Sequence, residues 1–429
     1  MAVHRPQCSW CMPLLLGLWL PACASDDSPE DAAPTGWQVG VNVVDVSPTA
    51  EEIATGQLYM GAYGILTARG PATGVHDPVY ARTMVLRAGS TTITMTILDM
   101  PGMSNRVLRA MVDGVQAATN LPKENIYVGS THSHSAPDLW SLWGGVPEGY
   151  KSRVIELTAQ SITDAVNSAQ PAELFVSKGT APNRNRRDWP ITDPELTVLD
   201  AKTSDGQRIG TLINFAAHPV KLGAENKLIS RDFCGYTVDQ AEDALGGRVL
   251  FFNGVVGDAS PDGGVGDSFD GAQSYGGIVA DAAVAVLSEQ TAVTPGIYRD
   301  QTPWAQEVTN AAFIGLANAG ILDYDTTTVG TGLGIDTQVT YFRLGTEVQA
   351  IAFPGEALTR TGLDVKSKLT LPFHLWLGLT TDALGYFVKH DEWMTGRNGD
   401  YEESVSMGET AGDNSITVLS GAIAKDTMP

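Results

Sequence analysis

Cysteine is scarce in this sequence, with only four among 429 residues. Cys8, Cys11 and Cys23 lie at the N-terminus, and Cys234 is the single cysteine in the rest of the chain. The distribution predicts no structural disulfide in the folded part. A chain of this length can bury a core large enough to fold without such cross-links.

Positive charge is scarce as well, since 27 Lys and Arg stand against 49 Asp and Glu, for a formal net charge of −22. An acidic chain of this kind lacks the electrostatic attraction that binding to nucleic acid or to an anionic membrane surface requires, so we expect no nucleic-acid partner. Beyond the N-terminal region no apolar run is long enough to predict a transmembrane helix. The balance of 43% hydrophobic and 18% charged residues is typical of a globular protein.

The N-terminus has the pattern of an export signal. Arg5 precedes the apolar run Met12 to Leu20, which is too short to span a bilayer. The tetrapeptide ending in Cys23 (Leu-Pro-Ala-Cys) resembles a bacterial lipobox and predicts a lipid anchor on this cysteine, the alternative being an ordinary signal peptide cut nearby. We therefore expect an exported protein, either a bacterial lipoprotein on the outer membrane or cell surface or a secreted protein.

The domain organisation that we predict has three parts: a signal peptide with lipobox at 1–23, an acidic tether at 24–36 and a catalytic domain at 37–429. Strand and helix patterns alternate in the third part, without an internal repeat or a break in composition. Strands are expected at 37–46, 80–86, 91–98, 125–128, 196–201, 210–216 and 249–253, and a hairpin around Gly345-Thr346 at 339–353. Helices are expected at 105–118, 150–169, 275–287 and 356–369. The order predicts an α/β layered sandwich with a mixed β-sheet and an active site at strand ends. The region from Trp376 on reads as irregular.

Histidine is rare, with seven in the chain, yet His132 and His134 stand together in one hydroxyl-rich stretch after a predicted strand that Gly129 should break. Side chains two apart on an extended segment point the same way, so both imidazoles are expected to reach one space. The alternative is a pair of half-exposed loop histidines.

Further polar residues also follow predicted strands: His218, Asp258 with Ser260, and Glu356. Strand ends gather along one edge of an α/β sheet, so these segments can converge on one crevice. Two or three histidines with a carboxylate form a normal catalytic zinc set. Each residue also has an ordinary structural alternative: a core histidine at 218, a calcium loop at 258–269 that lacks the final glutamate, and a helix-capping role for Glu356.

Five segments, in order along the chain, resemble motifs of the neutral ceramidases, zinc amidases that cleave the N-acyl bond of ceramide. They are Gly129-Ser-Thr-His-Ser-His-Ser135, Asn183-Arg-Asn-Arg186, Leu212-Ile-Asn-Phe-Ala-Ala-His-Pro219, Asn253 to Pro261, and Pro354-Gly-Glu356. The resemblance implies zinc held by His132, His218, Glu356 and Tyr386. It implies His134, Arg186, Asp258, Ser260 and Tyr401 around the substrate amide, with Arg184 competing with Arg186 for its position.

Zinc can lower the pKa of bound water to about 7 and polarise a carbonyl, which addresses the low reactivity of an amide. We expect His134 to handle the proton, Arg186 and Tyr401 to donate to the developing oxyanion, and Ser260 to hydrogen-bond within the site. No Gly-x-Ser-x-Gly elbow supports a serine nucleophile. The resemblance therefore implies Zn2+ as cofactor and a lipid-like N-acyl substrate. The alternatives are a zinc hydrolase of another amide or ester, and a surface lipoprotein that only binds ligand.

Overall fold

A computed structural model describes residues 35–64 and 69–427. The predicted signal peptide, the lipid site at Cys23 and nearly all of the predicted tether lie outside the described residues. The described residues all belong to one compact unit, Pro34–Pro429. Within them, no helix combines the length and the apolar character that crossing a bilayer requires.

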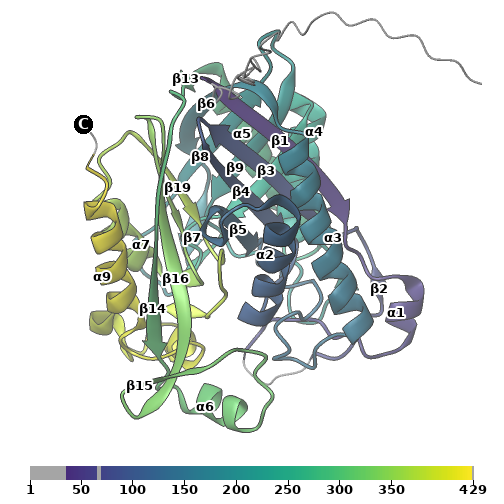
Figure 1. The fold of residues 1–429 in the computed structure, drawn as a ribbon. Helices are drawn as coiled ribbons and strands as arrows, with labels where there is room; N and C mark the ends of the chain where they lie inside the picture. Colours follow the sequence, from purple (N-terminus) through teal and green to yellow (C-terminus); the bar gives the residue numbers. More distant parts are fainter. Residues whose placement is uncertain (1–34, 65–68, 428–429) are drawn as a thin grey trace, which may run out of the picture. The chain divides into compact units, whose positions relative to one another are not determined.

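The larger of two main sheets is mixed and has nine strands (Figure 1). Its outermost pairs, β9 with β11 and β4 with β5, are parallel, and the pairs between them are antiparallel. The strand order is β11 (Arg248–Asn253), β9 (Arg208–Phe215), β8 (Glu195–Lys202), β6 (Gln170–Thr180), β1 (Trp37–Asp45), β3 (Tyr80–Ala88), β4 (Thr91–Leu98) and β5 (Ile126–Ser130), with β13 (Thr291–Ala292) on β6.

The second main sheet has five strands, and its hairpin β16–β17 turns at Gly345 as the sequence predicts. Its order is β14 (Ile297–Glu307), β16 (Gly332–Leu344), β17 (Val348–Ala352) and β19 (Phe373–Leu377), with β15 (Thr327–Val329) paired to β16. Short two-stranded pairs lie between the larger elements: β2 (Gly74–Val75) with β10 (Leu228–Ile229), β7 (Asn183–Asn185) with β12 (Ala259–Pro261), and β18 (Glu356–Ala357) with β20 (Tyr386–Phe387).

The two sheets pack face to face, and the alternation of side chains along β11 makes this visible. Leu250 and Phe252 pack in the same cluster as Phe342 of the second sheet. Val249 and Phe251 point the other way and pack with Phe233 under helices. Successive residues of a strand face opposite sides, so one sheet supplies the walls of two separate cores.

Helices cover both outer faces, which gives four layers, α-β-β-α (Figure 1). The larger sheet is covered by α2 (Asn105–Thr119), α3 (Glu148–Asn167), α4 (Asp232–Leu245) and α5 (Phe269–Ala285), and the second by α6 (Ala311–Asn318), α7 (Thr359–Lys366) and α9 (Ala411–Ala424). Two short helices are α1 (Ala50–Ala54) and α8 (Tyr401–Ser404). The predicted fold class, an α/β layered sandwich with a mixed sheet, is confirmed.

Three local predictions were wrong. The strand before His132 runs to Ser130 and is not broken at Gly129, whose glycine instead permits close approach, because a Cβ there would lie 2.3 Å from Thr380 Oγ1. The helix expected from 356 begins at Thr359, so Glu356 does not cap it.

The third error concerns the region from Trp376 on: turns and short elements do make up most of it as far as residue 410, but it ends in the regular helix α9. Helix α9 was missed because its sequence, Ala-Gly-Asp-Asn-Ser-Ile, has weak helix propensity. Burial of Ala411, Leu419 and Ala422 against the second sheet stabilises this helix, and a packing contact of that kind is not visible in local sequence.

Candidate active site at the strand ends

His132 and His134 follow β5 and are both buried, so they are not half-exposed loop residues. Their rings lie edge to face with centroids 4.6 Å apart. The cause differs from the predicted strand alternation, because His132 has a φ of 68°, in the left-handed region. A turn at this residue, and not an extended segment, brings the two imidazoles together.

His218 follows β9 and meets His132 from the other side, with ring centroids 4.9 Å apart. Its Nδ1 donates to the carbonyl oxygens of Val256 (2.7 Å) and Ala259 (3.2 Å). The Nδ1 of His132 donates to the carbonyl oxygen of Pro101 in the same way. Because a carbonyl can only accept, both Nε2 atoms carry lone pairs, and these lone pairs face the interior of the site.

Glu356, at the start of β18, completes this group. Its Oε2 lies 3.2 Å from His132 Nε2 and 3.1 Å from His218 Nε2, and no residue in the described part of the chain donates a hydrogen bond to it. Two imidazole lone pairs and an orphaned carboxylate oxygen in a buried space repel one another unless a cation lies among them. This donor set therefore fits a zinc ion.

His134 belongs to the same space. Its Nε2 lies 3.1 Å from His132 Nε2, and its buried Nδ1 has no hydrogen-bond partner among residues 35–64 and 69–427. The nitrogens of His132, His134 and His218 lie within 4.8 Å of one another, so His134 stands either beside the ion or among its ligands.

Tyr386 is brought to the site by strand pairing. Residues Glu356 and Tyr386 are direct partners in the parallel pair β18–β20. The Tyr386 hydroxyl lies 3.4 Å from His218 Nε2 and accepts a hydrogen bond of 2.8 Å from Arg186 Nη2. A phenol oxygen with a guanidinium on one side and the metal-binding group on the other is placed to act as a fourth ligand.

Burial and neighbouring charges perturb the pKa values here. Burial and the nearby Arg186 guanidinium lower the pKa of His218 to about 3, which keeps this imidazole neutral. Burial also lowers the pKa of His134, and the two other imidazoles lower it further. For Glu356 burial acts to raise the pKa, but the contacts with His132 and His218 outweigh it and hold the pKa well below its usual range. Neutral imidazoles at His134 and His218 beside an ionised Glu356 are protonation states that metal binding requires.

The two candidate arginines differ in their exposure. Arg184 is exposed, whereas Arg186 is largely buried and its guanidinium lies over the Tyr386 ring, 5.2 Å from the centroid. The same guanidinium is 6.0 Å from the centroid of Tyr401. The Tyr401 hydroxyl accepts a hydrogen bond of 3.0 Å from the Gly64 amide, so its own proton is free to point into the pocket.

Asp258 and Ser260 lie behind these groups. The Asp258 carboxylate accepts hydrogen bonds from the Thr359 amide (2.7 Å), the Thr359 hydroxyl and Asn185 Nδ2 (2.7 Å), so it ties β18–α7 to β7. Ser260 is buried in β12, opposite Arg184 in the β7 pairing. We assign both a supporting role.

An apolar pocket opens from this polar centre. His132, His134, Glu356, Tyr386 and Tyr401 form its polar end. Its walls include Trp140, Leu142, Trp143, Phe313, Leu322 and Met407. A polar reaction centre at the end of an apolar pocket suits an amphipathic molecule.

Sequence reasoning missed Glu402, Arg187 and Tyr63. Glu402 contacts Arg186, and the Tyr63 ring packs edge-on against His134 at 4.7 Å between centroids. The doublets Arg186-Arg187 and Glu402-Glu403 are a weak signal, because adjacent like charges normally lie on a solvated surface.

Known proteins with similar sequences point to the same family as the motifs. A family model described as neutral/alkaline non-lysosomal ceramidase, N-terminal, matches residues 37–268, more than half of the 429 residues. A neutral ceramidase of Mycobacterium tuberculosis is 23% identical over 240 residues, which is 49% of this chain and 36% of that protein. Neutral ceramidase B of Dictyostelium discoideum is 26% identical over 135 residues, 26% of this chain and 19% of that protein. The matches thus span little more than a third of these relatives or less.

The fold matches a solved structure over nearly its full extent. The crystal structure of neutral ceramidase from Pseudomonas aeruginosa superposes with a TM-score of 0.75 and 17% identity, covering 91% of this chain and 74% of that chain. A ceramidase structure in complex with C2 gives the same TM-score of 0.75 at 16% identity. At these identities the likeness establishes the fold.

Proposed function

The chain belongs to the neutral/alkaline non-lysosomal ceramidase family, and we propose that it is a zinc-dependent amidohydrolase that cleaves the N-acyl amide bond of ceramide or a related N-acyl lipid. The observation that carries the proposal is the convergence of His132, His218 and Glu356 from three distant segments at the polar end of an apolar pocket.

In this proposal His132, His218, Glu356 and Tyr386 hold the zinc ion. When bound, zinc would supply the Lewis acidity that polarises an amide carbonyl and acidifies water. The two histidines are oriented by Nδ1 hydrogen bonds to main-chain carbonyls, which fix their tautomers before any ion binds.

The remaining side chains act on the proton and on the developing charge. His134 is held neutral by burial, so its imidazole can take a proton from the attacking water and pass it to the leaving amine. The Arg186 guanidinium lies 6.0 Å from the centroid of the Tyr401 ring, and Tyr401 lines the polar end of the pocket. Both side chains would donate to the carbonyl oxygen as it gains negative charge.

The substrate is proposed from the pocket and the family together. Trp140, Trp143 and Phe313 offer an apolar wall that an acyl or long-chain base can occupy, while the amide reaches the polar end. The expected products are a fatty acid and a long-chain amine. Ester or non-lipid amide hydrolysis and pure ligand binding are the competing outcomes.

The test is release of fatty acid from a fluorescent ceramide by the purified chain, with and without chelator, and with His132→Ala. We expect hydrolysis that the chelator and the substitution abolish and that added zinc restores after chelation. Hydrolysis of a simple ester or acyl amide without hydrolysis of ceramide would assign another substrate. If the purified chain binds one equivalent of lipid but contains no zinc and hydrolyses no substrate, the protein is a ligand-binding protein and not an enzyme.

Export and lipidation form a separate proposal, supported by the leader-like pattern at 1–23 and the Cys23 tetrapeptide. We propose that the mature protein begins at Cys23 and is held at a membrane by lipid on this residue. Mass spectrometry of the N-terminal peptide after expression in a bacterium should show diacylated cysteine. An unmodified N-terminus at another residue would favour an ordinary signal peptide.

A further inference from the structure

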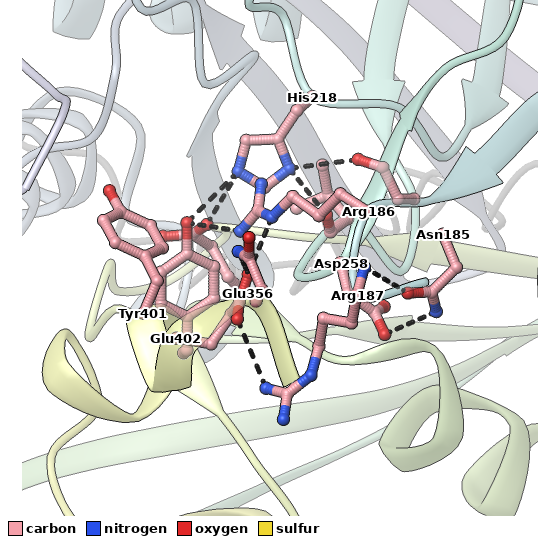
Figure 2. Close-up of polar contacts among 12 residues, drawn as sticks. Asn185, Arg186, Arg187, His218, Asp258, Glu356, Tyr401 and Glu402 are labelled. Atoms are coloured by element: carbon pink, nitrogen blue, oxygen red, sulfur yellow. Dashed lines mark hydrogen bonds and ion pairs between the residues drawn. The ribbon is translucent and has the colours of Figure 1, made fainter. Parts of the chain in front are cut away.

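Arg186 is held from two sides. Its Nη2 donates to the Tyr386 hydroxyl at 2.8 Å, and its Nε donates to Glu402 Oε1 at 2.8 Å (Figure 2). The guanidinium therefore bridges a proposed metal ligand and a carboxylate that itself does not reach the metal-binding group. Burial acts to lower the pKa of Arg186, but Tyr386, Glu402 and Glu356 outweigh it and raise the pKa, so the side chain stays charged.

Glu402 is held in turn by a second arginine. Its Oε2 accepts from Arg187 Nη1 at 3.3 Å, and Arg187 Nη2 donates to Glu403 Oε1 at 2.8 Å. Asn398 Nδ2 donates to the Glu402 Oε1 atom at 2.9 Å. The side chains of Arg187 and Glu402 are 0% exposed, so no solvent screens these ion pairs.

The two glutamates differ in what they touch. Among the residues that the structure describes, Glu402 forms ion pairs with both Arg186 and Arg187, whereas Glu403 forms an ion pair with Arg187 only. Adjacent residues in one short helix thus make equally buried ion pairs, but of the two only Glu402 contacts the guanidinium that donates to Tyr386, a residue of the pocket lining. The chain itself provides a matched control.

We propose that Glu402 is a positioning residue: it holds the Arg186 guanidinium against the Tyr386 hydroxyl, with Arg187 as the buried counter-charge that keeps Glu402 in place. The inference rests on the proposed function, because the role of Arg186 toward the substrate amide does. An arginine side chain has large rotational freedom. Its planar guanidinium group donates hydrogen bonds well to a substrate only when other contacts already hold it in one orientation. Preorganised donors stabilise a developing oxyanion, and misplaced ones lose most of that effect.

A merely structural ion pair would make a different prediction. Breaking any buried pair leaves an uncompensated charge and destabilises the fold, whichever glutamate is changed. Positioning instead predicts that kcat responds to Glu402 and not to Glu403, at similar losses of thermal stability.

The first experiment compares Glu402→Gln with Glu403→Gln in the zinc-loaded full chain, using a fluorescent ceramide. We expect Glu402→Gln to lower kcat about 10–100-fold, with KM changed less than about threefold, since the lost contact acts on the transition state. Glu403→Gln should leave kcat within about threefold of the wild type. Equal losses of kcat in the two variants would overturn the proposal.

The second experiment combines Glu402→Gln with Arg186→Met. If Glu402 acts through Arg186, the glutamate substitution should change kcat by less than about twofold once the guanidinium is gone. Independent, multiplicative losses in the double variant would contradict the proposal.

A third measurement needs neither zinc nor turnover. In ¹⁵N-arginine-labelled chain the Nε–H resonance of Arg186, assigned by its loss in Arg186→Met, should exchange slowly with solvent in the wild type and in Glu403→Gln. In Glu402→Gln the Arg186 Nε–H proton should exchange with solvent at least about tenfold faster, because the amide oxygen of glutamine is a weaker acceptor than the carboxylate. Unchanged exchange in Glu402→Gln would overturn the positioning role. A wild type without ceramidase activity would overturn the proposed function while this result still stood.

Discussion

Glu356 and Tyr386 are direct partners in the two-residue parallel pairing of β18 with β20. This pairing fixes the carboxylate and the phenol side by side at the same end of the pocket. The Tyr386 hydroxyl also receives the Arg186 guanidinium, so three segments of the chain depend on one short pairing.

Removing the Tyr386 hydroxyl tests its role as a metal ligand. We expect Tyr386→Phe to weaken zinc binding by about 10–100-fold, because the ring stays in place while the oxygen is lost. Zinc affinity is measured by competition with a chromogenic chelator. Tyr401→Phe is the matched control, since that hydroxyl contacts the Gly64 amide. Equal zinc affinity in both variants would remove Tyr386 from the ligand set.

The two arginines of the Asn-Arg-Asn-Arg stretch offer a second paired test. Arg186→Met should lower kcat/KM for ceramide by about 100-fold or more, since a donor to the oxyanion is lost. Arg184→Met should leave it unchanged, because that side chain is exposed. Steady-state kinetics decide between them, and a larger loss from the Arg184 variant would reverse the assignment.

Pocket wall residues should control recognition of the acyl chain. Phe313→Ala removes part of the apolar wall. We therefore expect kcat/KM for a long-chain ceramide to fall about tenfold, because the acyl chain loses apolar contact. For a short-chain ceramide that does not reach this wall the change should stay within about twofold. Identical losses for both substrates would place the acyl chain elsewhere.

Asp382 predicts a pH dependence of stability. Burial raises the pKa of its carboxyl to about 7, against hydrogen bonds from the Ala383 amide and the Thr337 hydroxyl that lower it. A folded-state pKa above the ordinary value means that the contribution to stability is full below about pH 4 and is lost as the pH rises through about 7.

The variant Asp382→Asn resembles the protonated form at every pH. Relative to wild type, its free energy of unfolding should therefore be about 2–4 kcal/mol more favourable at pH 8 than at pH 4. Urea denaturation at the two pH values measures this difference. A variant whose offset from wild type is the same at both would show that Asp382 is ionised in the folded state.

Sequence patterns predicted the elements whose period is regular, such as the helix that Ser104 caps at its N-terminus and the strands around Gly89. They also identified the two histidines 132 and 218, because each follows a strand that ends at the same edge. These signals are local, so a single sequence contains them.

The features that were missed depend on tertiary contact. The turn that brings His132 and His134 together arises from a left-handed φ that residues other than glycine adopt uncommonly, so the strand pattern does not predict it. Glu402 and Arg187 look like surface charges until folding buries them against each other. The choice between Arg184 and Arg186 likewise required knowing which of the two side chains points away from solvent.

The central claim is that His132, His218, Glu356 and Tyr386 bind one zinc ion. The most direct test is an anomalous difference map from zinc-loaded crystals, collected on both sides of the zinc absorption edge. We expect a single strong peak about 2.0–2.3 Å from Nε2 of both histidines and from Glu356 Oε2, with the Tyr386 oxygen next to it. A peak located elsewhere, or no peak at all in crystals whose chain hydrolyses ceramide, would contradict the account.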